Sequence, residues 1–325
     1  MSTLTSEPNT AWAASPTGLQ WSIGHGPFEA TVVEVGGGLR TVTRDGQDVV
    51  AGYRLDEHCQ SGRGQQLMPW PNRIRGGRYP WAGKEHQLPI TEVSRGNASH
   101  GLVRWAPWEL IEHEADSVTV GYRLHPQPGW DHHLDLRTTY VLDDSGLVIT
   151  AAARNLGQVA APFGYGAHPY LSIGRTPLDE VRLVVPAEER AEVDEQQIPV
   201  GRGPVEGTPL DFRAERAVGA LRLDTAYTRI SRDDDGMWRC HVRTPDAGDL
   251  VLWADESFPW VQVFTGAAAE HKGLPGIAVE PMTCPPDAFN SRESLVTLEP
   301  GAEWTGTWGI SVGISMGSSM GSTEG

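Results

Sequence analysis

The chain has 325 residues, 39% of them apolar, and its formal net charge is −16 at pH 7. A surface that binds nucleic acid needs clustered positive charge, so this balance argues against a nucleic-acid partner. No apolar run approaches the length of about 18 residues that a membrane-spanning helix needs, so we expect no membrane partner either.

The two ends of the chain are predicted to lie outside the fold. Residues 1–15 lack the basic segment and the apolar core of a secretory signal, which favours a cytoplasmic protein. Residues 312–325 are rich in Gly and Ser. We expect disordered tails at 1–15 and 312–325 and one domain over 16–311. Three cysteines without C-x-x-C spacing predict neither a disulfide framework nor a zinc site.

Alternation of apolar and polar residues with period 2 dominates the chain between the tails. It predicts strands at 28–35, 117–124, 134–142, 147–155, 181–186, 240–245, 250–255 and 260–266. The sequence Asp-Asp-Ser-Gly at 143–146 predicts a hairpin turn. Helical periodicity is nearly absent, and its best short candidate is 214–222. Many short strands between Gly and Pro turns indicate an all-β sandwich or barrel.

Arg73 is the first residue that suits a ligand pocket. It follows the sequence Pro-Trp-Pro-Asn, and prolines restrict the neighbouring backbone to extended geometry. Its guanidinium has several fixed donors that could bind sugar hydroxyls or an anionic group. The nearby Arg63, Arg75 and Arg78 leave an acidic ligand open. A structural or surface role for Arg73 is the alternative.

Two histidines lie beside glycines. His168 follows Gly164 and Gly166, and glycines let a ligand approach the backbone closely. An imidazole there can give or take a proton near neutral pH, although a buried structural histidine fits the pattern equally well. His100 also precedes a glycine, but taken alone it carries little information.

Glu280 ends the apolar run Ile277–Val279 and precedes a proline. Partial desolvation beside an apolar strand end raises the pKa of a carboxyl, which suits a general base at neutral pH. The alternative is a solvated glutamate at the end of a strand. Asp224 could accept hydrogen bonds from vicinal hydroxyls, although its short motif would not draw attention by itself.

Two further patterns are decoys. His132 and His133 suggest a metal, but adjacent residues of a strand point to opposite faces, and no tetrahedral ligand set is visible. Residues 313–317 match G-x-S-x-G. A hydrolase would need a helix, an Asp and a His after this motif, and the chain offers no Asp or His there.

The segments that contain Arg73, His100, His168 and Glu280, in this order, resemble the aldose 1-epimerase (galactose mutarotase) family. The resemblance spans about residues 20–310, and its most specific parts are 69–79, 100–104, 164–171 and 279–291. It implies an all-β fold, a large antiparallel β-sandwich of the galactose mutarotase-like supersandwich type. The sequence departs from many relatives at Thr91-Glu92 and at 129–136, which leaves the identity of the substrate open.

The resemblance also implies an acid and a base. Glu280 matches the family's general base, His168 its general acid, and His100 a second pocket histidine near the ring oxygen. Mutarotation needs a base to take the proton of the C1 hydroxyl while an acid protonates the ring oxygen. We therefore expect Glu280 ionised and His168 protonated at the same pH, on opposite sides of the C1–O5 unit.

The remaining implied residues hold a small-molecule sugar. Arg73 and Asp224 match sugar-gripping positions, and we expect Asn72, beside Arg73, to bind the substrate too. The expected function is the interconversion of α and β anomers of an aldohexose by a monomer or homodimer, with no cofactor and no metal. Two alternatives stay open: an epimerase for an anionic hexose (sulfoquinovose or a hexose 6-phosphate), and a non-catalytic carbohydrate-binding protein on the same fold.

Overall fold

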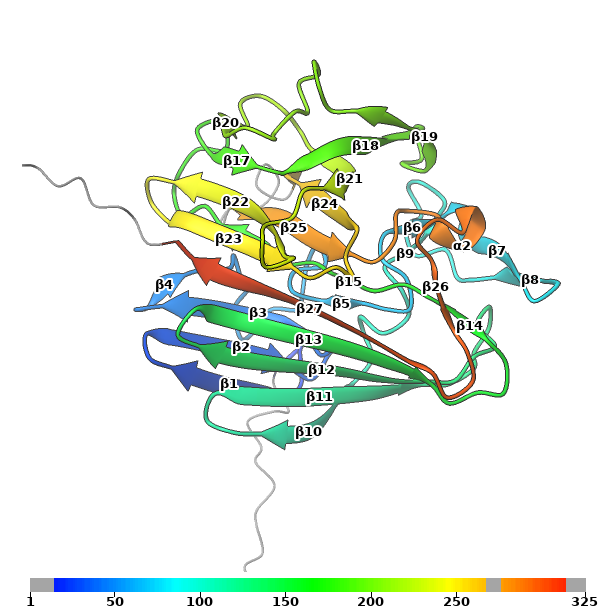
Figure 1. The fold of residues 1–325 in the computed structure, drawn as a ribbon. Helices are drawn as coiled ribbons and strands as arrows, with labels where there is room; N and C mark the ends of the chain where they lie inside the picture. The colour runs from blue at the N-terminus through cyan, green and yellow to red at the C-terminus, as the bar shows by residue number, and fades with distance from the viewer. Residues whose placement is uncertain (1–14, 267–275, 314–325) are drawn as a thin grey trace, which may run out of the picture.

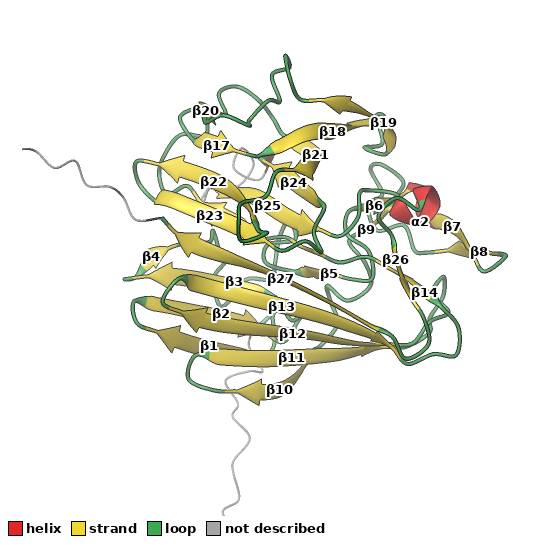
Figure 2. Cartoon of the chain, viewed as in Figure 1, coloured by secondary structure: helices red, strands yellow, loops and turns green. Residues whose placement is uncertain are grey.

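The computed structural model describes residues 15–266 and 276–313. Strands and loops make up most of this part, and the helix α2 (Ala288–Ser291) is a single turn (Figure 2). Apart from Ser15 and residues 312–313, the expected tails lie outside the described residues, as does most of the G-x-S-x-G pattern. Within the described ranges, no helix has the length and apolar character needed to cross a membrane.

The largest sheet has nine strands in antiparallel pairs. Its order is β10 (Glu109–His113), β11 (Ser117–Leu124), β12 (Leu134–Asp143), β13 (Gly146–Asn155), β27 (Glu303–Val312), β23 (Gly248–Ala254), β22 (Trp238–Thr244), β17 (Arg182–Val184) and β20 (Arg216–Ala217). Buried and more exposed residues alternate along β12, because only one face of this strand meets the core.

A second, eight-stranded sheet carries most of the site described below. Its order is β19 (Pro199–Pro204), β18 (Ala187–Val193), β21 (Asp224–Ile230), β24 (Trp260–Phe264), β25 (Gly276–Met282), β15 (Gly166–Ala167) and β5 (Gln66–Leu67), with β16 (Tyr170–Ser172) also paired to β25. Every residue of β25 is buried. Both faces of this strand are covered, so its residues do not alternate between buried and exposed.

Smaller sheets complete the fold. A four-stranded sheet, β1 (Gln20–His25), β2 (Phe28–Val33), β3 (Leu39–Arg44) and β4 (Gln47–Asp48), lies beside β11 and β12 (Figure 1). The two-stranded pairs are β14 (Ala161–Phe163) with β26 (Val296–Leu298), β6 (Arg73–Ile74) with β9 (Ala98–Ser99), and β7 (Arg78–Trp81) with β8 (Lys84–Gln87). The 3-10 turn η2 (Arg75–Gly77) joins β6 to β7.

A buried chain of hydrogen bonds links the two large sheets through their shared core. Tyr140 of β12 donates its hydroxyl to the carbonyl oxygen of Gly37 and accepts from Nε2 of Gln66 in β5. Oε1 of Gln66 accepts from the hydroxyl of Tyr165, which accepts in turn from Nε1 of Trp308 in β27. Each polar side chain in this chain is paired, so its burial costs little.

The structure confirms the predicted all-β class and most of the predicted strands. The hairpin turn at 143–146 joins β12 to β13, and Asp143 pairs with Gly146 as expected. The helical candidate at 214–222 is wrong. It contains β20 and a turn in which Gly219 has a φ of +62°, because pairing of β20 with β17 outweighs a weak local helical preference.

Replacing Tyr140 by Phe should lower the free energy of unfolding by about 1–3 kcal/mol, because the carbonyl of Gly37 and the amide of Gln66 would lose a buried partner. Urea denaturation measures the difference. Tyr122→Phe, at a half-buried position of β11, is the matched control and should change stability by less than about 0.5 kcal/mol. Equal losses of unfolding free energy in the two variants would show that the buried hydrogen bonds of Tyr140 do not stabilise the protein.

Candidate active site

One face of the eight-stranded sheet forms the floor of a pocket of about 330 Å³. Glu280 of β25 lies directly opposite Gln262 of β24, and Phe264 of β24 lies opposite Asp224 of β21. Directly paired residues of antiparallel strands share a face, and so do residues two apart on one strand. The register therefore places all four side chains on the same side, and all four line the pocket.

Glu280 and His168 meet at the bottom of this pocket. Their side chains are almost completely buried, and His168 Nε2 lies 3.3 Å from Glu280 Oε1. The imidazole stacks on the ring of Tyr170, with centroids 5.1 Å apart and planes 11° apart. Glu280 lies inside β25 and not at its end, so its desolvation is more complete than the sequence suggested.

The charge state of this pair differs from the expectation of an ionised Glu280 beside a protonated His168. Burial, and then the charge of Asp224, raise the pKa of Glu280 well above 4.5, against the opposing effect of Arg73. Burial, and then the positive charge of Arg104, lower the pKa of His168 to about 3. Burying two charges costs more than their attraction returns, so this buried position favours a neutral carboxyl beside a neutral imidazole.

His100 forms the adjacent wall. Its backbone has a φ of +61°, and its N–H donates to the carbonyl oxygen of Asn72 at 2.7 Å. The N–H of Asn72 lies 3.2 Å from His100 Nδ1, which must accept, so the neutral ring carries its proton on Nε2. Burial, and then the charge of Arg104, hold the pKa of His100 well below 6.5. His100 is therefore a neutral donor, with its ring centroid 5.4 Å from that of His168.

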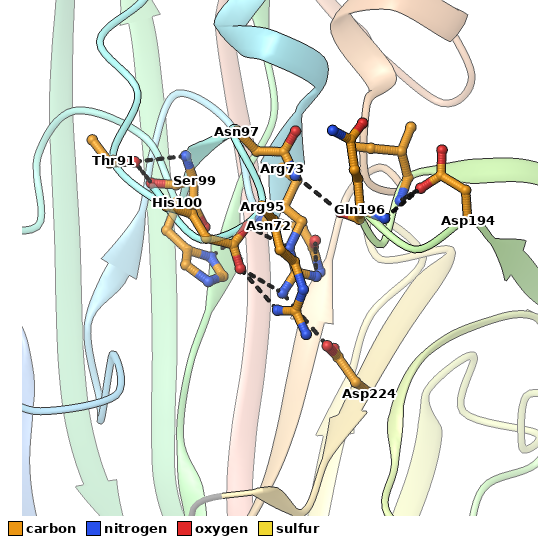
Figure 3. A network of polar contacts seen from close by, with 12 residues as sticks. Asn72, Arg73, Thr91, Arg95, Asn97, Ser99, His100, Asp194, Gln196 and Asp224 are labelled. Atoms are coloured by element: carbon orange, nitrogen blue, oxygen red, sulfur yellow. Dashed lines mark hydrogen bonds and ion pairs between the residues drawn. The ribbon is translucent and has the colours of Figure 1, made fainter.

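Arg73 is held by a network of acceptors rather than by the prolines alone (Figure 3). Its Nε and Nη2 donate to the two carboxylate oxygens of Glu92 at 2.8 and 3.1 Å, and Arg95 Nη1 donates to the same carboxylate. Arg73 Nη1 donates to Asn72 Oδ1, and Arg73 Nη2 lies 3.5 Å from Asp224 Oδ2. Although burial opposes the charge of Arg73, the bonds to Glu92 raise its pKa overall.

Several polar atoms of the pocket are positioned but unpaired. Gln262 Nε2 donates to Asp224 Oδ1 at 2.6 Å, which fixes this carboxylate between Gln262 and Arg73. Within the described part of the chain, Gln262 Oε1, Glu280 Oε2 and His168 Nδ1 are buried without a hydrogen-bond partner. Buried polar atoms are normally paired, so these atoms are suited to meet the hydroxyl groups of a ligand.

The structure brings together all six residues predicted for the site. Asn72, Arg73, His100, His168, Asp224 and Glu280 line the same pocket, although they come from segments far apart in the chain. Five further residues line the pocket that the sequence analysis did not assign to the site: Glu92, Arg95, Arg104, Trp105 and Gln262. Gln262 lies in a correctly predicted strand, but only the pairing of that strand with β25 could have revealed its place.

The other arginines and the histidine pair that the sequence singled out lie outside the pocket or contact other groups. Arg75 donates to Asp194 and Gln196, and Arg78 to Gln87, so neither lines the pocket. Arg63 donates to a backbone carbonyl and lies over the ring of Tyr170. No group of three or more metal-binding side chains is present in residues 15–266 and 276–313. His132 is buried among aromatic rings, including those of Trp81 and Trp130.

Comparison with known proteins gives a consistent result. The family model described as aldose 1-epimerase matches residues 20–311. The chain is 36% identical over 286 residues to the uncharacterized protein YihR of Escherichia coli, covering 88% of this chain and 90% of that protein. It is 31% identical over 302 residues to the galactose mutarotase of Mus musculus, covering 83% and 85% of the two chains.

Solved structures agree on the fold. A GalM/aldose epimerase homologue from C. elegans superposes with a TM-score of 0.78 at 21% identity, covering 90% of this chain and 99% of that one. A galactose mutarotase-like protein from Clostridium acetobutylicum gives a TM-score of 0.78 at 16% identity, covering 89% and 93%. At this identity the similarity shows the fold alone.

Glu280→Gln should stabilise the protein at neutral and alkaline pH. Above pH 4.5 the unfolded chain loses the proton of Glu280 while the native state, with its raised pKa, retains it. Native stability then falls by about 1.4 kcal/mol per pH unit until the folded pKa is reached, and the variant escapes this loss. Urea denaturation at pH 5 and pH 8 should show an advantage of the variant that grows with pH. An advantage that shrinks with pH would contradict the raised pKa.

Proposed function

The chain belongs to the aldose 1-epimerase family, and we propose that it interconverts the α and β anomers of an aldohexose by acid/base-catalysed ring opening and closure. Glu280 is the group that takes the proton of the C1 hydroxyl, and His168 is the group that protonates the ring oxygen. The observation that carries this proposal is the contact between these two buried side chains at the bottom of the pocket.

The contact suits mutarotation because the two reacting oxygens are bonded to the same carbon. A carboxyl and an imidazole 3.3 Å apart can each face one of these neighbouring atoms from the same side of the sugar. This replaces the expectation that the two groups straddle the C1–O5 unit from opposite sides. Positioned proton transfer of this kind contributes on the order of 10²–10⁴-fold to the rate.

The proton count closes without any other reactant. The step begins when the neutral Glu280 carboxyl passes its proton across the 3.3 Å contact to His168, which leaves a carboxylate beside an imidazolium. On ring opening, the proton of the C1 hydroxyl passes to the Glu280 carboxylate, the C1–O5 bond breaks as the C1 carbonyl forms, and O5 takes the proton from His168. The open-chain aldehyde then rotates about C1–C2, and both transfers reverse on the other carbonyl face. Ring opening thus returns the pair to the neutral form that burial favours, and that form accompanies the aldehyde.

The other pocket residues would hold the sugar while C1 moves. Arg73, Asp224 and Gln262 are fixed to one another, so their remaining donors and acceptors are aimed before the ligand arrives. His100 would donate from Nε2 to a sugar oxygen. Such preorganisation lowers the entropic cost of reaching the reactive geometry. A protein that merely binds sugar gains nothing from a buried acid beside an imidazole, which argues against the non-catalytic alternative.

Glu280→Gln should lower kcat for anomerisation by at least about 100-fold, because an amide cannot accept the C1 proton, while KM stays within a few-fold of wild type. Polarimetry on freshly dissolved α-glucose and α-galactose, supported by NMR exchange between anomers, measures the rate. Glu114→Gln makes the same chemical change at an exposed turn and should have no effect. Turnover near the wild-type rate in Glu280→Gln would reject the assignment, and an inactive wild type on every sugar would reject the function.

An anionic hexose is a second candidate substrate, for a reason that differs from the one suggested by the sequence. Arg104 lines the pocket, and among the described residues its guanidinium forms no ion pair with a carboxylate. Nη1 of Arg104 lies 3.5 Å from Gln65 Oε1, and burial lowers the pKa of Arg104. A phosphate or sulfonate on the sugar would supply the missing negative charge.

If the substrate is anionic, the wild type should prefer glucose 6-phosphate or sulfoquinovose to glucose. Arg104→Gln should then reduce kcat/KM for the anionic sugar by about tenfold or more relative to glucose, because a charge-assisted contact is lost. NMR anomer exchange over this panel measures the ratio. A wild-type preference for the neutral sugars would exclude the anionic candidate and leave the neutral aldohexose.

A further inference from the structure

The imidazole of His168 is not oriented by a hydrogen bond to its second nitrogen. A histidine that transfers protons is normally held by a carbonyl or carboxylate that binds its other ring nitrogen. In the part of the chain that the structure describes, His168 Nδ1 is buried without such a partner. The contact of Nε2 with Glu280 does not by itself fix the plane of the ring, so packing must set that plane.

Tyr170 of β16 supplies one side of this packing. Its ring lies nearly parallel to the imidazole of His168, in the offset stacking that aromatic pairs favour. Tyr170 is buried and does not line the pocket, so it contacts the imidazole rather than a bound sugar. It pairs with Ala278 of β25, two residues before Glu280. The strand that carries the carboxyl therefore also places the ring that supports the imidazole.

The loop before β5 supplies the other contacts. The hydroxyl of Tyr170 donates to the carbonyl oxygen of Ser61 at 3.0 Å, and the guanidinium of Arg63 lies over the tyrosine ring, 5.8 Å from its centroid. Between these two loop residues, Gly62 lies against the imidazole, since a Cβ atom there would come within 2.9 Å of Cδ2 of His168. Gly62 also has a φ of +74°, so this close approach requires glycine.

Backbone hydrogen bonds tie this loop to the histidine itself. The N–H of Gly64 donates to the carbonyl oxygen of His168 at 2.9 Å, and the N–H of His168 donates to the carbonyl oxygen of Gln65 at 3.2 Å. The loop therefore cannot shift without moving the backbone of His168. Tyr170 and the loop residues 61–63 together form a histidine clamp, which contacts the imidazole from two directions and is itself fixed to the same backbone.

We propose that Tyr170 is a positioning residue for the proton transfer: through the histidine clamp it holds the plane of the His168 imidazole in the orientation that transfer to the sugar needs. This inference rests on the proposed function, because a fixed ring plane matters to the rate only if the imidazole delivers a proton. The stacked ring of Tyr170 makes the contact, and its hydroxyl secures that ring to the loop. Phenylalanine should therefore replace Tyr170 with little loss, whereas an aliphatic side chain should not.

Tyr170→Leu should lower kcat for anomerisation by about tenfold to 100-fold and leave KM within a few-fold of wild type, because a turned imidazole impairs proton transfer rather than sugar binding. Tyr170→Phe should keep kcat within about threefold of wild type. NMR exchange between the anomers of glucose and galactose measures both constants. The nuclear Overhauser effect between the rings of His168 and His100 reports the orientation without turnover. It should persist in Tyr170→Phe and weaken in Tyr170→Leu.

Tyr227→Leu is the matched control. Tyr227 of β21 is also a buried tyrosine of the eight-stranded sheet, its hydroxyl donates to the carbonyl oxygen of Leu210, and it does not line the pocket. This variant should lose stability in urea as Tyr170→Leu does, but it should keep the wild-type kcat. An equal fall of kcat in the two leucine variants would show a general effect of core packing and overturn the proposal.

Two further outcomes would also overturn it. One is a folded Tyr170→Leu protein with the wild-type kcat. The other is a loss of kcat in Tyr170→Phe of about tenfold or more, which would assign the effect to the hydroxyl and does not depend on the folding of the leucine variant. If the wild type turns over no sugar but the Overhauser effect weakens in Tyr170→Leu alone, the clamp stands and the proposed function falls.

Discussion

The contact between the Glu280 carboxyl and the His168 imidazole, whose side chains are almost completely buried, is the feature on which the site depends. Removal from water raises the pKa of Glu280 and lowers the pKa of His168, so the pair is favoured in its neutral form. In the reaction that we propose, the same two groups exchange protons with the two oxygens bonded to C1 of the sugar.

The fold supplies that burial by placing Glu280 in β25, near the middle of the eight-stranded sheet. His168 arrives from the neighbouring segment between β15 and β16, and β15 pairs with β5. Gln66 of β5 belongs to the hydrogen-bond chain that crosses the core to Tyr140 and Trp308. The position of the imidazole is thus tied to the packing of the two large sheets.

The buried charges in the walls of the pocket are stabilised by pairing with one another. Arg73 is buried and would be costly alone, but Glu92 takes two of its donors, and Asp224 is shared between it and Gln262. These bonds fix the side chains of Arg73, Asp224 and Gln262 in the pocket wall. Arg104 and Trp105 line the same pocket but do not belong to that network. The guanidinium of Arg104 lies over the ring of Trp105 instead.

Local sequence determined the strands with strict alternation, such as β11 and β12, because period 2 is imposed by the chain itself. Together with the family motifs, it also predicted six residues that line the pocket. Tertiary structure alone decided that Gln262 faces Glu280 and that Glu92 holds Arg73, since both depend on pairing between distant segments. It likewise decided the neutral state of the Glu280–His168 pair, because desolvation is a property of the surrounding fold and no short stretch of sequence encodes it.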